Sequence, residues 1–243
     1  MQLDVIVATY NRKELLQRAI ESILGLVPPP GVEVRVIVAD NNSKDGTAEV
    51  VRSLALVKGD RLRYILEPRQ GKSYALNTAI AVADGTLIGI VDDDEELHPG
   101  WLNRVAELFR NPAVQYAGGR TLPTPGVLLP GWVPTSDFRA VLGWAEGPQQ
   151  SCPYTPDNPA VFLMGGNAVF RAEFLRNLGD GPYNVSVGRK GRGLLTADDD
   201  MYGRVLATGA VGIYDPGLIV YHAVQPYMLT KNYYRRWWFW GGG

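Results

Sequence analysis

The sequence predicts an α/β fold in which a Rossmann-like mixed sheet is flanked by helices. Two observations carry this prediction. Short runs rich in β-branched residues alternate with amphipathic segments through the first half of the chain, which is the pattern of parallel strands joined by helical crossovers. Polar and acidic residues also follow the ends of several apolar runs, and sheets of this type bind ligands at the carboxyl ends of their strands.

The strands expected in the first half cover residues 3–8, 32–39, 62–66 and 87–91. Apolar residues recur at helical spacing between them, so helices are expected over residues 15–24, 48–54 and 75–82. Beyond Arg120 a series of prolines interrupts any periodicity, and long irregular stretches in compact domains are often functional. Further strands are expected at residues 160–164, 211–214 and 218–221, with a short helix after Asp198.

The length of 243 residues suits one compact unit with an appendage. We expect a single domain with two abutting halves, residues 1–120 and 121–230. A basic and aromatic C-terminal segment, residues 231–243, would follow them.

Composition and charge restrict the function classes. Hydrophobic residues are 46% and charged residues 20% of the chain, which is typical of folded globular proteins. The net charge of −1 provides no global attraction to polyanions, so no nucleic-acid partner is expected. Cys152 is the only cysteine, which excludes an internal disulfide and favours a cytoplasmic protein. No apolar run approaches the ~20 residues that span a bilayer, and the N-terminus is expected to be a strand rather than a signal peptide.

Five consecutive carboxylates, Asp92 to Glu96, follow the apolar run 87–91. Like charges at one strand end repel each other, and the usual relief is a bound cation or a raised pKa. Oxygen ligands without cysteine indicate Mg²⁺ or Mn²⁺, which commonly bridge carboxylates to substrate phosphates. The alternative is that these acids only cap the helix that begins near Pro99.

A further acid, Asp40, ends the apolar run 32–39 and precedes the residues NNSKDGT. Such a carboxylate can accept hydrogen bonds from a ribose or a base, although the same residues also form a good turn and helix N-cap. The position predicts that Asp40 shares one sheet edge with Thr9 and Asp92.

Six segments occur in a characteristic order: VIVATYNR, VADNNSKDGT, QGKSYALNTAIAVADG, VDDDEELHPGWL, GGNAVFR and TADDDMYGRVLATG. Together they resemble the inverting glycosyltransferases of family 2, which have the GT-A fold, over nearly the whole chain. The resemblance implies metal-dependent transfer of a sugar from a nucleotide diphosphate donor, a UDP-sugar, to a saccharide or lipid-linked hydroxyl acceptor. The cofactor would be Mn²⁺ or Mg²⁺, and the product a cell-surface polysaccharide or glycolipid. Residues 1–120 would bind the donor, and residues 121–230 would bind the acceptor and carry catalysis.

The same resemblance assigns roles to individual residues. Thr9 and Asp40 would contact the nucleotide base, and Asp92 would lie near the ribose. Asp94 would hold the metal, and Asp198 would be the general base. The other residues that it places in the site are Lys72, Asp93, Arg189 and Arg192 toward the donor, His222 toward the metal, and Gly166, Asn167 and Trp237 toward the acceptor.

Several of these assignments have structural alternatives. The family motif has a glutamate where this chain has Ala197, and Asp198 could instead cap a helix. His222 follows an apolar run and suits a structural position as well as a metal site. The glycine-rich loop that contains Arg189 and Arg192 fits a lid over a diphosphate, or an ordinary solvated loop.

The segment KNYYRRWWFW, residues 231–240, interleaves aromatic and basic side chains. This composition suits peripheral contact with the inner face of a membrane, or a surface on which a sugar chain stacks. The alternative is a terminal helix that packs its aromatic residues on the domain or on a partner chain. Processive members of the family carry a similar Arg-Trp element with a glutamine three residues before the arginine. Here Tyr233 takes that place before Arg236, which disfavours processive synthesis.

Two other functions stay open. A sugar-1-phosphate nucleotidyltransferase uses a similar sheet, but it would be expected to have a glycine-rich loop after the first strand, where this chain reads ATYNRKE. A catalytically silent nucleotide-binding module could have lost turnover at Ala197. Donor hydrolysis in the presence of metal separates this module from an enzyme.

Overall fold

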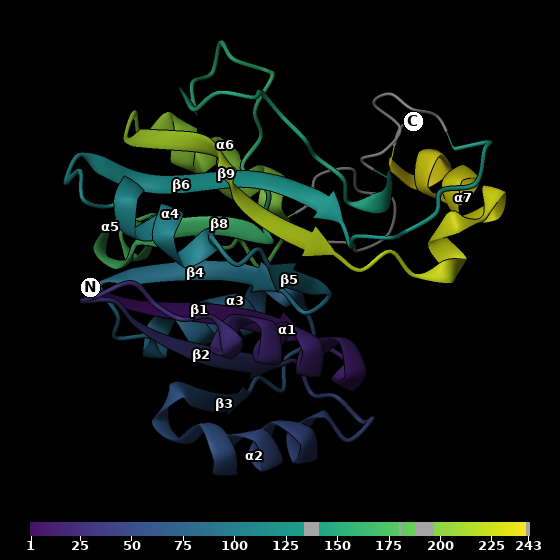
Figure 1. Cartoon of the computed structure of the whole chain (residues 1–243), viewed down its shortest axis with the longest axis horizontal. Helices are drawn as coiled ribbons and strands as arrows, with labels where there is room; N and C mark the ends of the chain where they lie inside the picture. The colour runs from purple at the N-terminus through teal and green to yellow at the C-terminus, as the bar shows by residue number, and fades with distance from the viewer. Residues whose placement is uncertain (134–140, 180, 188–196, 242–243) are drawn as a thin grey trace.

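The fold is built on one mixed sheet whose order is β3-β2-β1-β4-β8-β6-β9-β5, with β7 paired to β9 (Figure 1). The coordinates are a computed structural model that describes residues 1–133, 141–179, 181–187 and 197–241. The strands are β1 (Gln2–Thr9), β2 (Glu33–Asp40), β3 (Leu62–Leu66), β4 (Leu87–Asp92), β5 (Glu95–Leu97), β6 (Val114–Pro123), β7 (Cys152–Pro153), β8 (Asn167–Arg171) and β9 (Val211–His222). The helices are α1 (Lys13–Gly25), α2 (Thr47–Lys58), α3 (Lys72–Val82), α4 (Trp101–Leu108), α5 (Ala172–Arg176), α6 (Ala197–Ala207) and α7 (Lys231–Gly241), with short 3-10 helices η1 (Gly59–Arg61) and η3 (Pro226–Leu229).

The first half is the parallel part of the sheet, as predicted. β1 pairs in parallel with β2 and β4, and β2 with β3. α1 buries Leu16, Ile20 and Ile23, which share one helical face because they are three or four residues apart. The apolar runs of β1, β2 and β4 therefore became strands that are buried on both faces, which is the usual state of parallel strands, while β3 is only partly buried.

Two apolar clusters cover the two faces of the sheet. Adjacent residues of a strand point to opposite faces, so Val5 packs in the cluster that includes Trp101, and Ile6 in the cluster that includes Phe170. All four side chains are fully buried. Burial of each such side chain contributes about 1.5–3 kcal/mol, and the two clusters hold the strand ends in fixed positions.

The second half departs from the prediction in two places. The segments 211–214 and 218–221 form one strand, β9, which continues through a register shift opposite β6. Asp215 stabilises this irregularity, because its carboxylate accepts hydrogen bonds from Gly217 N at 2.8 Å and Ser151 Oγ at 2.6 Å. Residues 160–164 are not a strand. Their alternating apolar residues, Val161 and Leu163, are buried by packing against the second cluster rather than by strand pairing.

β6 carries the chain across the predicted boundary at residue 120. It pairs antiparallel with β8 and in parallel with β9, and β8 pairs with β4. The two predicted halves therefore share one continuous sheet, and the division between them stays a prediction.

α7 packs on a third, smaller cluster. Tyr234 is buried there with Val133, Leu142 and Met228, and Trp237 packs against it half-buried. In the part of the chain that the structure describes, no helix has the length and apolarity needed to cross a bilayer. The aromatic residues Tyr234 and Trp237 of α7 thus pack against the rest of the domain.

Candidate active site

The ends of three adjacent parallel strands bring Thr9, Asp40 and Asp92 to one edge of the sheet. The register pairs Thr9 of β1 with Asp40 of β2, and Ala8 of β1 with Asp92 of β4. The predicted shared edge is confirmed, and it lies at the carboxyl ends where such sheets bind ligands.

The turn after β1 directs Arg12 toward this edge. Asn11 has a φ of +53°, a left-handed conformation that asparagine adopts more readily than most residues. Its Oδ1 accepts a hydrogen bond from Lys44 N at 2.7 Å, and its backbone N donates to Ser43 Oγ at 2.9 Å. These bonds join the turn after β1 to the loop after β2 and fix the direction in which α1 begins.

Arg12 lies against two carboxylates of the acid run. Its Nη1 donates to Asp93 Oδ1 at 2.9 Å and to Asp94 Oδ2 at 2.8 Å. Thr9 Oγ1 donates to the other oxygen of Asp93 at 2.7 Å. Arg12 was missed as a site residue by the sequence analysis, although a cation directly after the first strand was the available signal.

The repulsion within the acid run is relieved by raised pKa values, one of the two ways that the sequence predicted, and by cationic side chains of the protein. Burial raises the pKa of Asp93 to about 6, although Arg12 acts in the opposite direction. Burial, together with the charges of Asp92 and Asp94, also raises the pKa of Glu95 well above its ordinary value. The pKa of Asp94 is lowered, because contacts with His222 and the charge of Arg12 outweigh its burial. In the described part of the chain, side chains such as Arg12 and Lys72 provide the positive charge beside these acids.

Lys72 joins the acid run to α6. Its Nζ lies 2.6 Å from Asp92 Oδ1 and 3.8 Å from Asp198 Oδ2. The partial loss of hydration of Lys72, whose side chain is 38% exposed, would by itself lower its pKa, but the charges of Asp92 and Asp198 raise it well above its ordinary value. Gly71, which precedes it, has a φ of +137°, a backbone conformation that favours glycine. The lysine is therefore held as a cation between Asp92 and Asp198.

Two glycines make room for acidic side chains at the centre of the site. A β-carbon on Gly165 would lie 2.3 Å from Asp198 Oδ1, and one on Gly166 would lie 2.3 Å from Glu95 Oε2. Both approaches are far shorter than any real contact of a β-carbon. Gly166 thus provides space for a buried acid, and its contact with an acceptor stays a prediction.

Asp94 and His222 present two donor atoms to one point, since Asp94 Oδ2 and His222 Nε2 are 3.5 Å apart. Two ligands at ~2.1 Å from one ion lie roughly 3–3.5 Å apart, and Mg²⁺ commonly takes one or two protein ligands plus substrate phosphates. Nδ1 of His222 is buried and, within the described ranges, has no hydrogen-bond partner. The residues present therefore fit a divalent cation, although the described part of the chain contains no cage of three or more such side chains.

Asp40 is buried at the end of β2 and is already hydrogen-bonded. Its two oxygens accept bonds from Ser43 N at 2.9 Å and from the Tyr64 hydroxyl at 2.7 Å. Each carboxylate oxygen can accept a second bond. The turn-forming role that the sequence allowed is confirmed, and contact with a base stays a prediction.

Asn167 is fully buried. Its Oδ1 accepts a hydrogen bond from Trp101 Nε1 at 3.0 Å, and its Nδ2 donates to the carbonyls of Arg120 and Leu218 at 2.9 Å each. The predicted contact between this side chain and an acceptor is not supported by this placement, because all three bonds connect β8 to neighbouring elements. These bonds anchor the start of β8, directly after Gly165 and Gly166.

The remaining predicted site residues are Trp237, Arg189 and Arg192. Trp237 packs half-buried against the third cluster, so its contact with an acceptor stays a prediction. Arg189 and Arg192 lie outside the described residues.

Tyr183 is a further residue near these charges that the sequence did not indicate. It is buried, and its pKa is raised by burial and then by Asp198. Its backbone is fixed by Asn77, whose Nδ2 donates to Tyr183 O at 2.6 Å and whose Oδ1 accepts from Tyr183 N at 3.0 Å. The Tyr183 hydroxyl has no hydrogen-bond partner among the residues described.

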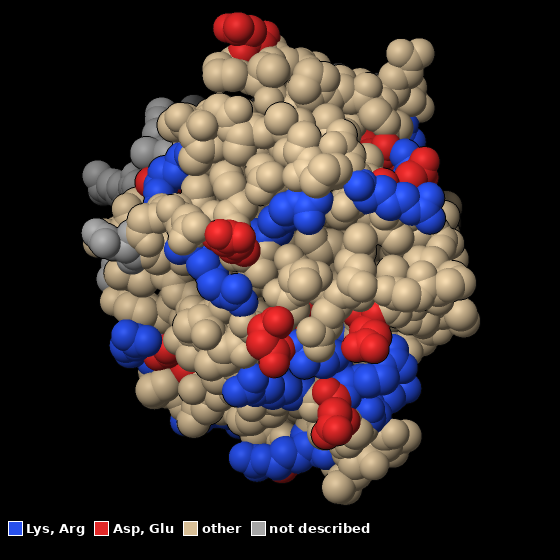
Figure 2. Space-filling view, turned by 90° about the vertical axis from the view of Figure 1, so that its left-hand side faces the viewer, with Lys and Arg blue, Asp and Glu red and all other residues tan. Residues whose placement is uncertain are grey.

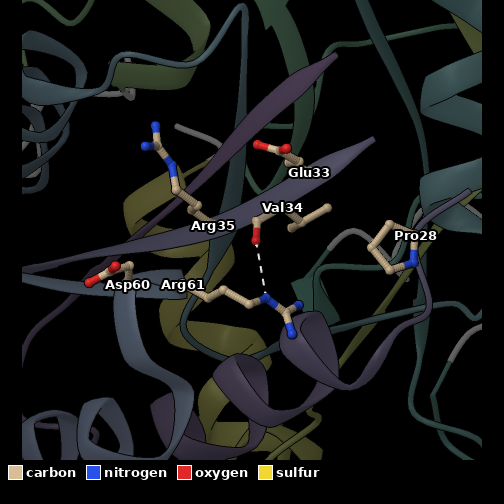
Figure 3. Close-up of a pocket in the computed structure, with 6 residues that line it drawn as sticks. All are labelled: Pro28, Glu33, Val34, Arg35, Asp60 and Arg61. Carbon is tan, nitrogen blue, oxygen red and sulfur yellow. Dashed lines mark hydrogen bonds between the residues drawn. The ribbon is translucent and has the colours of Figure 1, made fainter. Parts of the chain in front are cut away.

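A pocket of about 270 Å³ lies at the opposite, amino end of the parallel strands (Figure 3). Its arginines are already engaged, because Arg61 Nε donates to the Val34 carbonyl at 3.4 Å and Arg35 is bonded to Asp4 and Asp84. Figure 2 shows that acidic and basic side chains are intermixed on this side of the molecule. The pocket is thus remote from the acid run and offers no unpaired cation.

The mixed sheet, the acid run that ends its central strand β4 and the facing carboxylate of α6 define a GT-A glycosyltransferase fold. The pattern of glycosyl transferase family 2 matches residues 4–179, and the chain belongs to this family.

Two curated proteins are similar to this chain over part of their length. The succinoglycan biosynthesis protein ExoM of Rhizobium meliloti is 29% identical over 148 residues, which cover 60% of this chain and 48% of that protein. The GalNAc(5)-diNAcBac-PP-undecaprenol beta-1,3-glucosyltransferase of Campylobacter jejuni is 36% identical over 108 residues, which cover 44% of this chain and 34% of that enzyme. The chain thus spans about half or less of the length of these relatives.

Among solved structures, the mannosyltransferase PcManGT of Pyrobaculum calidifontis, in complex with GDP-Man and Mn²⁺, is similar with a TM-score of 0.66 and 26% identity. The alignment covers 92% of this chain and 57% of that one.

Proposed function

We propose that this chain carries the catalytic part of an inverting glycosyltransferase that transfers a sugar from a nucleotide diphosphate to a hydroxyl group. One observation carries the proposal. Lys72 Nζ lies 2.6 Å from Asp92 of the acid run and 3.8 Å from Asp198 of α6, so the groups proposed for the donor and for the acceptor proton meet at one point.

The proposed reaction is a single displacement. The acceptor oxygen attacks the anomeric carbon from the side opposite the diphosphate, and Asp198 takes the proton of the acceptor hydroxyl. The bond between the anomeric carbon and the diphosphate oxygen breaks, and its electron pair leaves with the diphosphate. Lys72 is a cation beside Asp92 and would stabilise the charge that develops on the leaving group.

The proposed cofactor is Mn²⁺ or Mg²⁺, held by Asp94 and His222. When bound, such an ion neutralises negative charge on a diphosphate. The 3.5 Å separation of the two donor atoms supports this assignment, and the Pyrobaculum mannosyltransferase was solved with Mn²⁺.

The proposed donor is a UDP-sugar whose base lies near Thr9 and Asp40. The GDP-Man complex of the Pyrobaculum enzyme makes a guanosine donor the alternative. A saccharide or lipid-linked acceptor is proposed, in line with relatives named for succinoglycan biosynthesis and for an undecaprenol-linked substrate.

The proposed location is cytoplasmic, with peripheral contact at the inner face of the membrane through residues 231–240. Lys231, Arg235 and Arg236 of α7 are exposed, while the aromatic Tyr234 faces the third cluster. Cations presented this way are attracted by anionic lipid surfaces.

Asp198→Asn tests the proposed function. The variant should bind UDP or GDP with metal as the parent does, but should transfer sugar at least ~10²-fold more slowly, the typical effect of losing a general base. Asp199→Asn removes a charge from the same helical turn and is the matched control, with transfer expected near the parental rate.

Other outcomes identify the rival functions. A parent that binds nucleotides but releases no sugar from any donor would be a silent binding module. A parent that releases pyrophosphate from a nucleoside triphosphate and a sugar-1-phosphate would be a nucleotidyltransferase.

A further inference from the structure

Arg12 shares an oxygen with the proposed metal site. Its Nη1 lies 2.8 Å from Asp94 Oδ2, and the same oxygen is 3.5 Å from His222 Nε2. A metal ion bound by that oxygen and that nitrogen would lie close to the guanidinium nitrogen. Because two cations at such a distance repel each other strongly, Arg12 and a metal ion compete for Asp94.

The side chain of Arg12 is placed so that it can leave this position. It is 44% exposed, and both of its hydrogen bonds to the acids start from the single atom Nη1. Its backbone is fixed by the turn at Asn11, so the guanidinium would stay near the sheet edge after it moves. Asp93 would keep its hydrogen bond from Thr9 at 2.7 Å.

A diphosphate provides the guanidinium with a new partner at the same edge. Arginine binds phosphate oxygens through two parallel hydrogen bonds, a geometry that lysine cannot reproduce. The acid run that Arg12 now faces is also the run proposed to carry the metal and its diphosphate. Arg12 therefore lies within reach of both the carboxylates and the ligand that would replace them.

We propose that Arg12 is a donor-binding residue with two alternating partners. Without a donor it bonds to Asp93 and Asp94 and takes the place of the metal charge; with metal at Asp94 it binds the donor diphosphate. This proposal rests on the proposed function and adds a residue to its donor site.

The proposal requires two effects of opposite sign when Arg12 is removed. Metal binding without nucleotide should become tighter, because a competing cation is gone. Nucleotide diphosphate binding at saturating metal should become weaker, because a phosphate ligand is gone. A residue that only stabilised the acid run would not produce this pair of effects.

The experiment measures Mn²⁺ binding without nucleotide from the electron paramagnetic resonance signal of free Mn²⁺, and then UDP and GDP binding by calorimetry at saturating Mn²⁺. Arg12→Gln should lower the Kd for Mn²⁺ and raise the Kd for the nucleotide, each by about tenfold or more, as expected for one close charge contact. Arg12→Gln combined with Asp94→Asn should lose the gain in Mn²⁺ affinity.

Arg18→Gln is the matched control. Arg18 lies on α1, which begins directly after Arg12, and is 51% exposed; its ion pair is with Glu96 of the same acid run and not with Asp94. It should change either Kd by less than about twofold, as is usual for an exposed ion pair.

The proposal is overturned if the Kd of Arg12→Gln for Mn²⁺ is unchanged or raised, or if neither protein binds Mn²⁺. It is also overturned if the Kd for the nucleotide is unchanged. Arg12→Lys keeps a charge at this position, and both of its Kd values should fall between those of the parent and Arg12→Gln. If Arg12→Gln does not fold by thermal melting, Arg12→Lys carries the test, and parental values for both Kd then overturn the proposal. Failure of the proposed function is separate, because it would appear as a parent that binds Mn²⁺ and nucleotide without transferring sugar.

Discussion

Gly165→Ala would test whether the backbone opposite Asp198 sets the position of the proposed base. The added β-carbon would lie 2.3 Å from Oδ1, 2.4 Å from Cγ and 2.6 Å from Oδ2 of Asp198. Ordinary van der Waals contact begins at 3.4 Å, so the carboxylate must retreat by about 1 Å. A misplacement of this size costs about 10²-fold in rate, which is ~2.7 kcal/mol in the activation free energy.

The assay is steady-state transfer kinetics together with calorimetric binding of the nucleotide diphosphate. We expect kcat/KM to fall about 10²-fold, while nucleotide affinity stays close to that of the parent, because Asp198 is proposed to act on the acceptor hydroxyl and not on the nucleotide. The variant combined with Asp198→Asn should be no slower than Asp198→Asn alone, since both changes act on one carboxylate.

Gly203→Ala is the matched control, because Gly203 lies on the same helix as Asp198 and a β-carbon there has no neighbour within 4 Å. This variant should keep the parental transfer rate and stabilise the helix by up to ~1 kcal/mol. A Gly165→Ala variant that folds and transfers sugar within a few-fold of the parent would refute this role of Gly165. It is also refuted if Gly165→Ala slows the Asp198→Asn variant as much as it slows the parent.

Asp40→Asn should weaken nucleotide binding by roughly tenfold, about 1.4 kcal/mol for one lost bond to a charged acceptor, with the Kd for Mn²⁺ unchanged; equal nucleotide affinity in calorimetry would remove Asp40 from the site. Because burial raises the pKa of Asp93 to about 6 from its ordinary 3.8, the folded state binds more protons than the unfolded state between these values. The contribution of Asp93 to the free energy of unfolding should therefore fall by about 3 kcal/mol as pH rises through this window. Urea denaturation of the parent and of Asp93→Asn from about pH 4 to about pH 7 measures this difference, and a constant or rising difference contradicts it. Replacing Lys231, Arg235 and Arg236 by glutamine should reduce co-sedimentation with anionic vesicles at low salt, since each exposed cation contributes about 1 kcal/mol; a parent that stays in the supernatant would contradict membrane contact.

Much of the parallel half was predictable because its signals are local. The apolar runs that became β1 and β2 are buried on both faces, and a doubly buried strand is recognisable from its own residues. The ends of those strands then place Thr9, Asp40 and Asp92 at one edge, since parallel neighbours must end on the same side.

The irregular half was less predictable because its strands are defined by partners far along the chain. β9 continues past Asp215, whose carboxylate accepts hydrogen bonds from Arg104, Ser151 and Gly217, and pairs with β6 on both sides of this position. Val161 has an apolar pattern around it but is buried without a partner strand. A sequence pattern records which residues avoid water, but it does not record which strand will pair with them.

The family, the parallel sheet and the acid run that ends β4 could be recognised in the amino-acid sequence, because each depends on residue types at short spacing. The bond of Arg12 to Asp94, the approach of Gly165 to Asp198 and the place of Tyr183 near the same charges emerge in the folded protein. These contacts join residues from different elements, and their distances depend on how the two apolar clusters pack the helices against the sheet.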